Sequence, residues 1–460
     1  MSRRPHLSLP YRPRLPRPLT AALAAALVTV AGCGGGTHAP RPTTQVAALG
    51  AATIAPTATT ASAVARVDPR AAALQAAMRH WMGRAGAMTG AYVVDLTTGT
   101  PLFALGADVG RAPASVEKIY TSVALLDELG PDARLHTKVL GAGSLGRGGM
   151  WHGDLYLRGA GDPTFGSEVF NRTWELGYGS TVSALVDQLR RRGITSVTGA
   201  VIADASLFDD RRGGPESGYA ADTPDLGGQL SALTYNHGAA VGMSPEAFAA
   251  RQLALSLRAA HVQLTIGPRT PTGVAPHDAR TLAVVPSPRL STMLRLMDVP
   301  SDDLYAELLT KQLGARFGGS GTTTAGAHVI AQELDVYGVH PTVVDGSGLS
   351  RANRSSPRQV VKLLQALADS PVGGVLAASL PVTGVNGTTI RIGRNTDAQG
   401  RCTAKTGTLD YVTNLAGYCS APGGDRLAFA VFIDGPGNER GVELLSRIVA
   451  DLVRLDPHHR

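Results

Sequence analysis

The pattern of hydrophobic and polar positions predicts that folded structure begins near residue 67. Apolar residues recur at helical spacing over residues 70–81, which indicates an amphipathic helix. Two short runs, 90–96 and 102–105, alternate as strands do, and the threonine- and glycine-containing turn between them predicts a hairpin. A second helical pattern covers residues 116–129. This part of the chain is therefore predicted to form a strand pair followed by a helix.

The pattern changes after residue 134 and predicts a separate α+β block. Residues 135–140 and 154–158 alternate like strands around a glycine-rich stretch, 141–146, that fits the G-x-G-x-x-G pattern of dinucleotide sites. Such a site needs a helix directly after the glycines. Here another strand follows, so we interpret the stretch as a hairpin loop. The block also contains two helical patterns and one further strand-like run, at residues 181–192, 244–259 and 197–203.

A helical pattern with polar motifs resumes near Ser287, so residues 135–283 are expected to be an insertion within another domain. After the insertion, residues 304–314 predict an amphipathic helix. Residues 403–409 and 414–418 predict two neighbouring strands. The fold class predicted for the whole chain is therefore α+β.

The first residues of the chain predict export. An apolar run, residues 19–30, has the length of the hydrophobic part of a signal peptide and is shorter than the roughly 20 apolar residues that span a bilayer. It ends in Val-Ala-Gly-Cys, which resembles a bacterial lipobox, where the cysteine thiol takes a diacylglycerol. We expect residues 1–32 to be a signal peptide and Cys33 to be the lipidated N-terminus. The alternative is an ordinary secretory signal with an incidental cysteine.

Residues 33–66 are mostly Gly, Pro, Thr and Ala, with almost no bulky apolar side chains. Such a segment cannot bury enough surface to become ordered, so we predict a disordered tether. The protein is expected to lie in the cell envelope, anchored by its lipid to the outer face of the cytoplasmic membrane.

Cys402 and Cys419 flank the two strands predicted near the end of the chain. If the turn of this hairpin centres near Asp410 and Tyr411, the cysteines face each other across it, so a disulfide is geometrically possible. Export would permit this bond. Two unpaired buried thiols are the alternative that the sequence leaves open.

The positive charge of the chain comes mainly from the segment before the apolar run. Without its five arginines, the formal net charge falls from +7 to +2. We expect no nucleic-acid partner, because the remaining chain has no strong excess of positive charge. The arginines are Arg3, Arg4, Arg12, Arg14 and Arg17.

Only five lysines occur among the 43 basic residues, and two of them lie in motifs that suggest a hydrolase. A buried lysine can lose its proton and act as a base, whereas an arginine cannot. Ser115 and Lys118 are three residues apart at the start of a predicted helix, so the hydroxyl and the amine share one face. They could serve as nucleophile and base. A helix cap beside a solvated lysine would produce the same pattern.

Two further motifs carry candidate chemistry. Ser301 precedes two aspartates and a predicted helix, and it could relay a proton, although such a tripeptide is also typical of a helix cap. Lys405, Thr406 and Gly407 lie in a predicted strand next to a second one, as an edge-strand substrate site requires. The glycine would leave room for a peptide to pair with the strand. An ordinary turn is the alternative for this motif.

The order of these motifs, Ser-x-x-Lys, then Ser-Asp-x, then Lys-Thr-Gly, resembles that of the penicillin-recognising serine acyltransferases. Within that group the chain is similar to the class C low-molecular-mass penicillin-binding proteins, which are D-alanyl-D-alanine carboxypeptidases and endopeptidases. The long separation between Ser115 and Ser301 matches an inserted domain. The supporting stretches are residues 153–164, 302–307, 345–351 and 404–409.

The resemblance implies a transpeptidase-type domain, an antiparallel sheet flanked by helices, that is split by an inserted α+β domain. Residues 67–134 and 284–460 would form the discontinuous catalytic domain, and residues 135–283 the insertion. The implied partners are peptidoglycan stem peptides and β-lactams, and neither a metal nor another cofactor is implied. Catalysis would then use Ser115 as nucleophile, Lys118 as base and Ser301 as proton relay.

The resemblance also implies which residues bind the substrate. Lys405 with Thr406 or Thr408 would hold the terminal carboxylate of the peptide, and the N–H groups of Ser115 and Thr408 would form the oxyanion hole. Asp303 and Gly407 would complete this surface.

Asp303 departs from the family, which has an asparagine at this position. An amide can donate an N–H to the substrate carbonyl, whereas an ionised carboxylate only accepts. A carboxylate near Lys118 would also favour the ammonium, the wrong state for a base.

From the three motifs and the resemblance together, we expect a serine-type D-Ala-D-Ala carboxypeptidase, with or without endopeptidase activity. The alternative is an envelope lipoprotein of the same fold that binds peptidoglycan with weak or no turnover.

The lipobox generates a first prediction. Replacing Cys33 by alanine should release the protein from the membrane fraction or block its processing, because the thiol that takes the lipid is lost. Fractionation of cells and mass spectrometry of the mature N-terminus measure this. A mature N-terminus other than Cys33, without lipid, would contradict the anchor.

Overall fold

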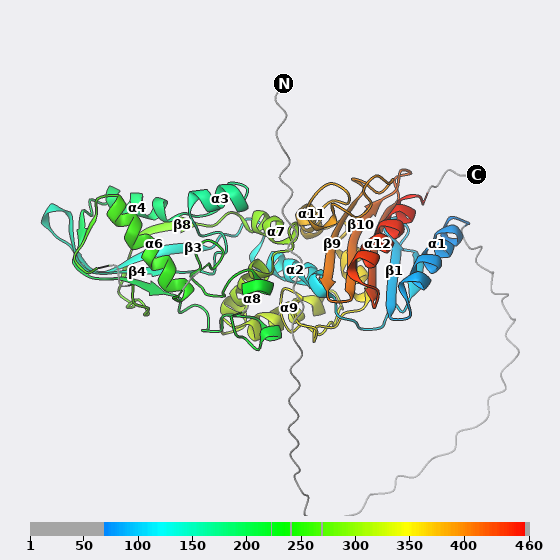
Figure 1. Cartoon of the computed structure of the whole chain (residues 1–460), viewed down its shortest axis with the longest axis horizontal. Helices are drawn as coiled ribbons and strands as arrows, with labels where there is room; N and C mark the ends of the chain where they lie inside the picture. The colour runs from blue at the N-terminus through cyan, green and yellow to red at the C-terminus, as the bar shows by residue number, and fades with distance from the viewer. Residues whose placement is uncertain (1–68, 222, 240–241, 268–269, 456–460) are drawn as a thin grey trace, which may run out of the picture. The chain divides into compact units, whose positions relative to one another are not determined.

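The computed structural model describes residues 69–221, 223–239, 242–267 and 270–455 (Figure 1). The predicted signal peptide, Cys33 and the predicted tether lie outside these residues. Within the described part of the chain, no helix has the length and apolar character that crossing a membrane requires.

A five-stranded sheet combines strands from both ends of the described chain, in the order β2-β1-β11-β10-β9. All of its neighbouring strands are antiparallel, and β9 lies at an edge. The predicted hairpin near residue 97 is formed by β1 and β2, and the predicted hairpin near residue 410 is formed by β9 and β10. The strands are β1 (Thr89–Asp95), β2 (Pro101–Leu105), β9 (Cys402–Leu409), β10 (Val412–Ser420) and β11 (Arg426–Asp434).

Helices cover both faces of this sheet, so its central strand is apolar from Leu427 to Ile433. Side chains of β11 alternate between the faces, as in any strand. Phe429 and Val431 belong to one core with α1 (Pro69–Ala85) and α12 (Asn438–Val453), which lie beside the strands in Figure 1. Phe432 belongs to a second core on the other face. Burying an aromatic or aliphatic side chain of this kind stabilises the fold by about 1.5–3 kcal/mol.

The second core surrounds α2, whose residues from Glu117 to Leu126 are all buried. A helix enclosed on every side places even its polar residues in the interior, and this explains why Lys118 is fully buried. The helices that surround α2 come after residue 286 in the chain. Together with α2 (Glu117–Leu129) they are α7 (Leu290–Asp298), α8 (Asp303–Phe317), α9 (Thr323–Val336), α10 (Pro357–Leu367) and α11 (Pro371–Ser379).

Residues 136–286 contribute a six-stranded mixed sheet in the order β7-β5-β4-β3-β8, with β6 paired to β4. Apolar faces of α4 and α6 share a core with this sheet, which includes Leu185, Leu253 and Leu157. The elements are β3 (His136–Leu145), β4 (Met150–Arg158), α3 (Glu168–Trp174), α4 (Val182–Arg191), β5 (Ser196–Val197), β6 (Val201–Asp204), α5 (Thr223–Leu226), α6 (Pro245–Ala259), β7 (Gln263–Leu264) and β8 (Arg280–Pro286).

Two predicted elements of this region were wrong in extent. The glycine-rich stretch 141–146 was expected to be a loop, but β3 continues through Leu145 and pairs with β4 as far as Trp151. Pairing with β4 overrides the weak strand propensity of these glycines. The strand predicted at 197–203 is two strands, because the Asp154 carboxylate accepts the N–H of Ala200 (2.7 Å) between them and replaces a ladder bond.

Cys402 and Cys419 stand directly opposite each other on β9 and β10. They form a disulfide, which joins the edge strand to its neighbour at the end away from the hairpin turn.

Candidate active site

Ser115 and Lys118 lie at the start of α2. A 3-10 turn, Ala114–Val116, carries Ser115 and runs directly into the helix. One turn later the Lys118 Nζ lies 3.0 Å from the Ser115 Oγ. The spacing of three residues therefore does place the amine beside the hydroxyl.

The loop before Ser115 is held by Asn414 of β10. Its Nδ2 donates to the carbonyls of Ala112 (2.9 Å) and Pro113 (3.0 Å), while its Oδ1 accepts from the Ile433 N–H. Ala114 has a φ of +50°, an uncommon conformation for a residue with a Cβ. Such conformations cost about 1–3 kcal/mol and persist where the surroundings fix them. A buried asparagine within an apolar strand is the sequence signal that could have identified Asn414.

Two glycines pack against the same loop. A Cβ added to Gly407 would lie 2.4 Å from the Pro113 carbonyl oxygen, and one added to Gly348 would lie 1.9 Å from that of Ala114. Both distances are shorter than a side chain tolerates. Gly407 was expected to clear the strand for a peptide. The structure adds a different reason for the glycine, because β9 needs it to approach the loop that carries Ser115.

The Lys118 ammonium contacts acceptors from three segments. Besides Ser115, it donates to the Asp303 Oδ1 (2.5 Å) and to the Ser347 carbonyl (2.7 Å). A protonated lysine has three donors and no acceptor, so these contacts account for all of its protons. Burial raises the pKa of Asp303, and the charge of Lys118 opposes that rise. The Nζ to Oδ1 distance is that of a salt bridge.

A second cluster joins Ser301 to the edge strand. The Lys405 Nζ donates to the Ser301 Oγ (2.7 Å) and to the Thr406 carbonyl (3.1 Å). Complete burial and then the charge of Lys118 lower the pKa of Lys405 to about 7, although Asp298 and Asp303 act in the opposite direction. The Thr406 hydroxyl donates to the Thr388 hydroxyl (2.6 Å).

Ser301 and Asp303 lie on either side of a helix cap. Asp302 caps α8, because its Oδ1 accepts from the Tyr305 N–H (2.9 Å). Ser301 has a φ of +64° and reaches Lys405, whereas Asp303 reaches Lys118. The helix cap and the proposed relay, considered as alternatives from the sequence, are thus compatible with each other.

Buried carboxyl groups lie near both lysines, and sequence analysis assigned no role to them. Asp298 accepts from the hydroxyls of Ser122 (3.2 Å) and Ser379 (2.7 Å). Burial raises the pKa of Asp298 to about 6, against the influence of Lys405 and the two hydroxyls. Glu307 accepts from the Ser347 N–H (2.9 Å), and therefore fixes the carbonyl that receives Lys118.

The loop from Asp345 to Ser350 is fixed by its own carboxylate. Asp345 accepts the N–H groups of Gly348 (2.8 Å) and Ser350 (2.6 Å). This loop contains Ser347 and Gly348, both of which contact the Ser115 region. The stretch 345–351 supported the family resemblance, but its function as a support for Ser115 and Lys118 appears in the contacts alone.

Direct contacts join Ser115, Lys118 and Asp303 in one group and Ser301 and Lys405 in a second, and the chain from Ser301 to Asp303 connects the two groups. Thr406 joins them through Lys405, Gly407 packs beside Ser115, and Thr408 follows on β9 as an exposed residue. In the described part of the chain, no three His, Cys, Asp or Glu side chains are grouped as a metal site would require.

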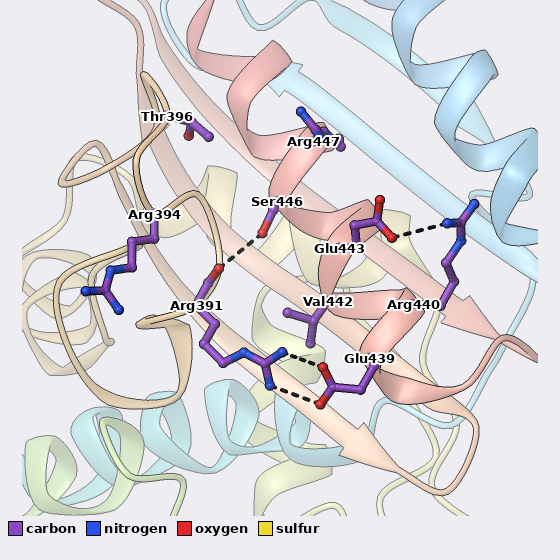
Figure 2. Close-up of a pocket in the computed structure, with 9 residues that line it drawn as sticks. All are labelled: Arg391, Arg394, Thr396, Glu439, Arg440, Val442, Glu443, Ser446 and Arg447. Atoms are coloured by element: carbon purple, nitrogen blue, oxygen red, sulfur yellow. Dashed lines mark hydrogen bonds and ion pairs between the residues drawn. The ribbon is translucent and has the colours of Figure 1, made fainter. Parts of the chain in front are cut away.

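A cavity of about 690 Å³ lies elsewhere, between α12 and residues 391–396 (Figure 2). Its two acidic residues, Glu439 and Glu443, already pair with Arg391 and Arg440. None of its lining residues belongs to the cluster around Ser115.

Sequence comparisons relate the chain to peptidases. The family model described as D-Ala-D-Ala carboxypeptidase 3 (S13) family matches residues 71–241 and 225–454. The chain is 28% identical over 459 residues to a D-alanyl-D-alanine carboxypeptidase of Actinomadura sp., covering 81% of this chain and 82% of that protein. It is 30% identical over 380 residues to a carboxypeptidase of Mycobacterium tuberculosis, covering 77% and 78% of the two chains.

A structural comparison relates the fold to a penicillin-binding protein. Penicillin-binding protein 4 of Haemophilus influenzae superposes with a TM-score of 0.67 at 19% identity, covering 79% of this chain and 96% of that one. The likeness confirms the predicted fold, an antiparallel sheet flanked by helices.

Proposed function

The chain belongs to the D-Ala-D-Ala carboxypeptidase 3 (S13) family, and we propose that Ser115 is the nucleophile of a serine-type D-alanyl-D-alanine carboxypeptidase. Its substrates are peptidoglycan stem peptides, and β-lactams acylate the same serine. The observation that supports this proposal most strongly is the 3.0 Å contact between the Ser115 Oγ and the Lys118 Nζ. A nucleophile beside a buried amine is the arrangement that serine acyl transfer needs.

The proposed reaction proceeds through an acyl-enzyme. The Ser115 Oγ attacks the carbonyl of the penultimate D-alanine while its proton passes to a neutral Lys118. The C–N bond then breaks, and Ser301 relays the proton from Lys118 to the departing amine of the terminal D-alanine, giving up its own proton to the amine and receiving that of Lys118. Water hydrolyses the Ser115 ester in the second half of the reaction. The N–H groups of Ser115 and Thr408 are proposed to stabilise the oxyanion of each tetrahedral intermediate.

The terminal carboxylate of the substrate is proposed to bind at the edge strand. Lys405 supplies the positive charge, and Thr406 or Thr408 supplies a hydroxyl. The edge position of β9 supports this assignment, because an edge strand offers backbone groups that a peptide can bind. Residues 381–383 already bond to Cys402 and Ala404, so the peptide would pair with the later residues of the strand.

We further propose that residues 67–134 and 284–460 form the catalytic domain and that residues 135–283 form an insertion. Supporting this division, the five-stranded sheet contains no strand from 136–286 among the described residues. The chain is proposed to be exported and anchored in the cell envelope through a lipid on Cys33, with residues 33–66 as the tether.

The nucleophile is tested by mass spectrometry after incubation with benzylpenicillin. We expect one adduct, on the peptide that carries Ser115. The adduct should disappear in Ser115→Ala and persist in Ser320→Ala, a control on an exposed loop. Lys118→Arg should be nearly as damaging as Lys118→Ala, because arginine keeps the charge but cannot accept the proton. An adduct on another residue would refute the assignment.

The carboxylate site predicts proton uptake on substrate binding. The pKa of Lys405 is lowered to about 7 in the free protein, and a substrate carboxylate favours the ammonium and raises it. Calorimetry of the Ser115→Ala variant with a D-Ala-D-Ala peptide, in two buffers, should show uptake of up to about one proton at pH 8 and much less at pH 6. A peptide with an amide in place of its terminal carboxylate is the control. Equal uptake by both peptides would exclude Lys405 as the carboxylate site.

Because position 303 is an aspartate, we predict that the unmodified protein is acylated slowly. Asp303→Asn removes the carboxylate that contacts the Lys118 amine and restores an N–H donor to the substrate carbonyl. Hydrogen bonds to charged groups are worth about 1.5–3 kcal/mol, so acylation by benzylpenicillin should accelerate roughly 10- to 100-fold. Asp369→Asn, which removes an exposed partner of Arg426, is the matched control. Slower acylation in Asp303→Asn would mean that the carboxyl group supplies something that an amide cannot.

A further inference from the structure

His237, from the region proposed as an insertion, contacts the proposed active-site motif of the other domain. Its Nε2 lies 2.8 Å from the Oδ2 of Asp302, the residue between Ser301 and Asp303. Sixty-five positions separate the two residues in the chain. The contact is therefore a product of the tertiary fold.

The surroundings of His237 fix its ring. Phe170 and Tyr305 lie on it at centroid distances of 6.4 Å and 5.9 Å, with interplanar angles of 31° and 39°. The Nδ1 faces the Gly227 carbonyl at 3.4 Å. His237 also has a φ of +63°, a conformation that a residue with a side chain keeps where neighbouring contacts impose it.

Among the described residues, the charged groups that raise the pKa of His237 are both acidic. They are Asp302, in front of α8, and Glu175, which follows α3 and accepts a hydrogen bond from the Tyr305 hydroxyl. Burial lowers the pKa of His237, but Asp302 and then Glu175 outweigh this effect and raise the pKa to about 9. The ring is therefore an imidazolium at neutral pH, able to donate from both nitrogens.

The Asp302 carboxylate is held at both oxygens. One oxygen caps α8 through the Tyr305 N–H, and the other receives His237. Its backbone N–H donates to the Met297 carbonyl (2.7 Å). The neighbours of Asp302 reach in different directions, Ser301 to Lys405 and Asp303 to Lys118. Any rotation of the Asp302 backbone would therefore move both proposed active-site side chains.

We propose that His237 is a positioning residue for the acylation reaction: it clamps Asp302 so that Ser301, the proposed proton relay, faces Lys405. The proposal rests on the proposed function of the site. It gives the region 135–283 an indirect part in the chemistry, because one of its side chains completes the support of the Ser301 motif.

The test is a double-mutant cycle measured on acylation by benzylpenicillin. His237→Ala should reduce the first-order acylation rate at saturating penicillin about 10- to 100-fold, since small misplacements of reacting groups have effects of this size. In a Ser301→Ala background the same substitution should cost about threefold or less, because the group that it positions is already absent. His340→Ala, which breaks an exposed pair with Asp335, is the matched control and should leave the rate unchanged.

Asp302→Asn provides a second variant if His237→Ala does not fold. Asparagine still caps the helix but lacks the charge that holds the imidazolium. It should show the same loss of rate and the same dependence on Ser301. An equal loss in both Ser301 backgrounds, or no loss, would overturn the positioning role. Failure of the unmodified protein to react with benzylpenicillin would instead overturn the proposed function itself.

Discussion

The buried ammonium of Lys118 links the three segments from which the site is assembled. It reaches Ser115 at the start of α2, Asp303 at the start of α8 and the Ser347 carbonyl in the loop before α10. Burying a charge is costly unless partners surround it. The three acceptors meet that requirement, and they can do so only when all three segments are in place. Formation of the site and formation of the core around α2 are therefore coupled.

Buried carboxyl groups surround the two buried lysines of the site, Lys118 and Lys405. Asp298 faces the Lys405 side, whereas Glu307 and Asp345 shape the loop that receives Lys118. Burial, followed by the charge of Asp345, raises the pKa of Glu307 to about 8, so this carboxyl group takes up a proton more readily than an exposed glutamate. Replacing one member of a buried charged pair is usually destabilising by about 3–5 kcal/mol. A buried lysine that has lost its partner can avoid this destabilisation by losing its proton. The neutral amine that results is the form that a general base requires.

At Asp303 the requirements of catalysis and of folded-state stability oppose each other. The carboxylate satisfies the buried charge of Lys118, and so favours the folded state. The same contact occupies the amine that the reaction needs in its neutral form. Two candidate functions were drawn from the sequence, an active carboxypeptidase and a weakly active binder. Which of them applies depends on whether the contact with Asp303 leaves the Lys118 amine available for the reaction.

The sequence alone determined the fold class, the family and the positions of the three motifs, because each depends on spacing within a short stretch. The distance between Ser115 and Lys118 is set by one helical turn, and the opposition of Cys402 and Cys419 is set by one hairpin. Tertiary structure decided the rest. Three contacts join residues that are far apart in the chain. Asn414 bonds to the loop before Ser115, Lys118 bonds to the Ser347 carbonyl, and His237 bonds to Asp302. Local spacing carries no information about such contacts, since they arise only when separate segments are packed around one core.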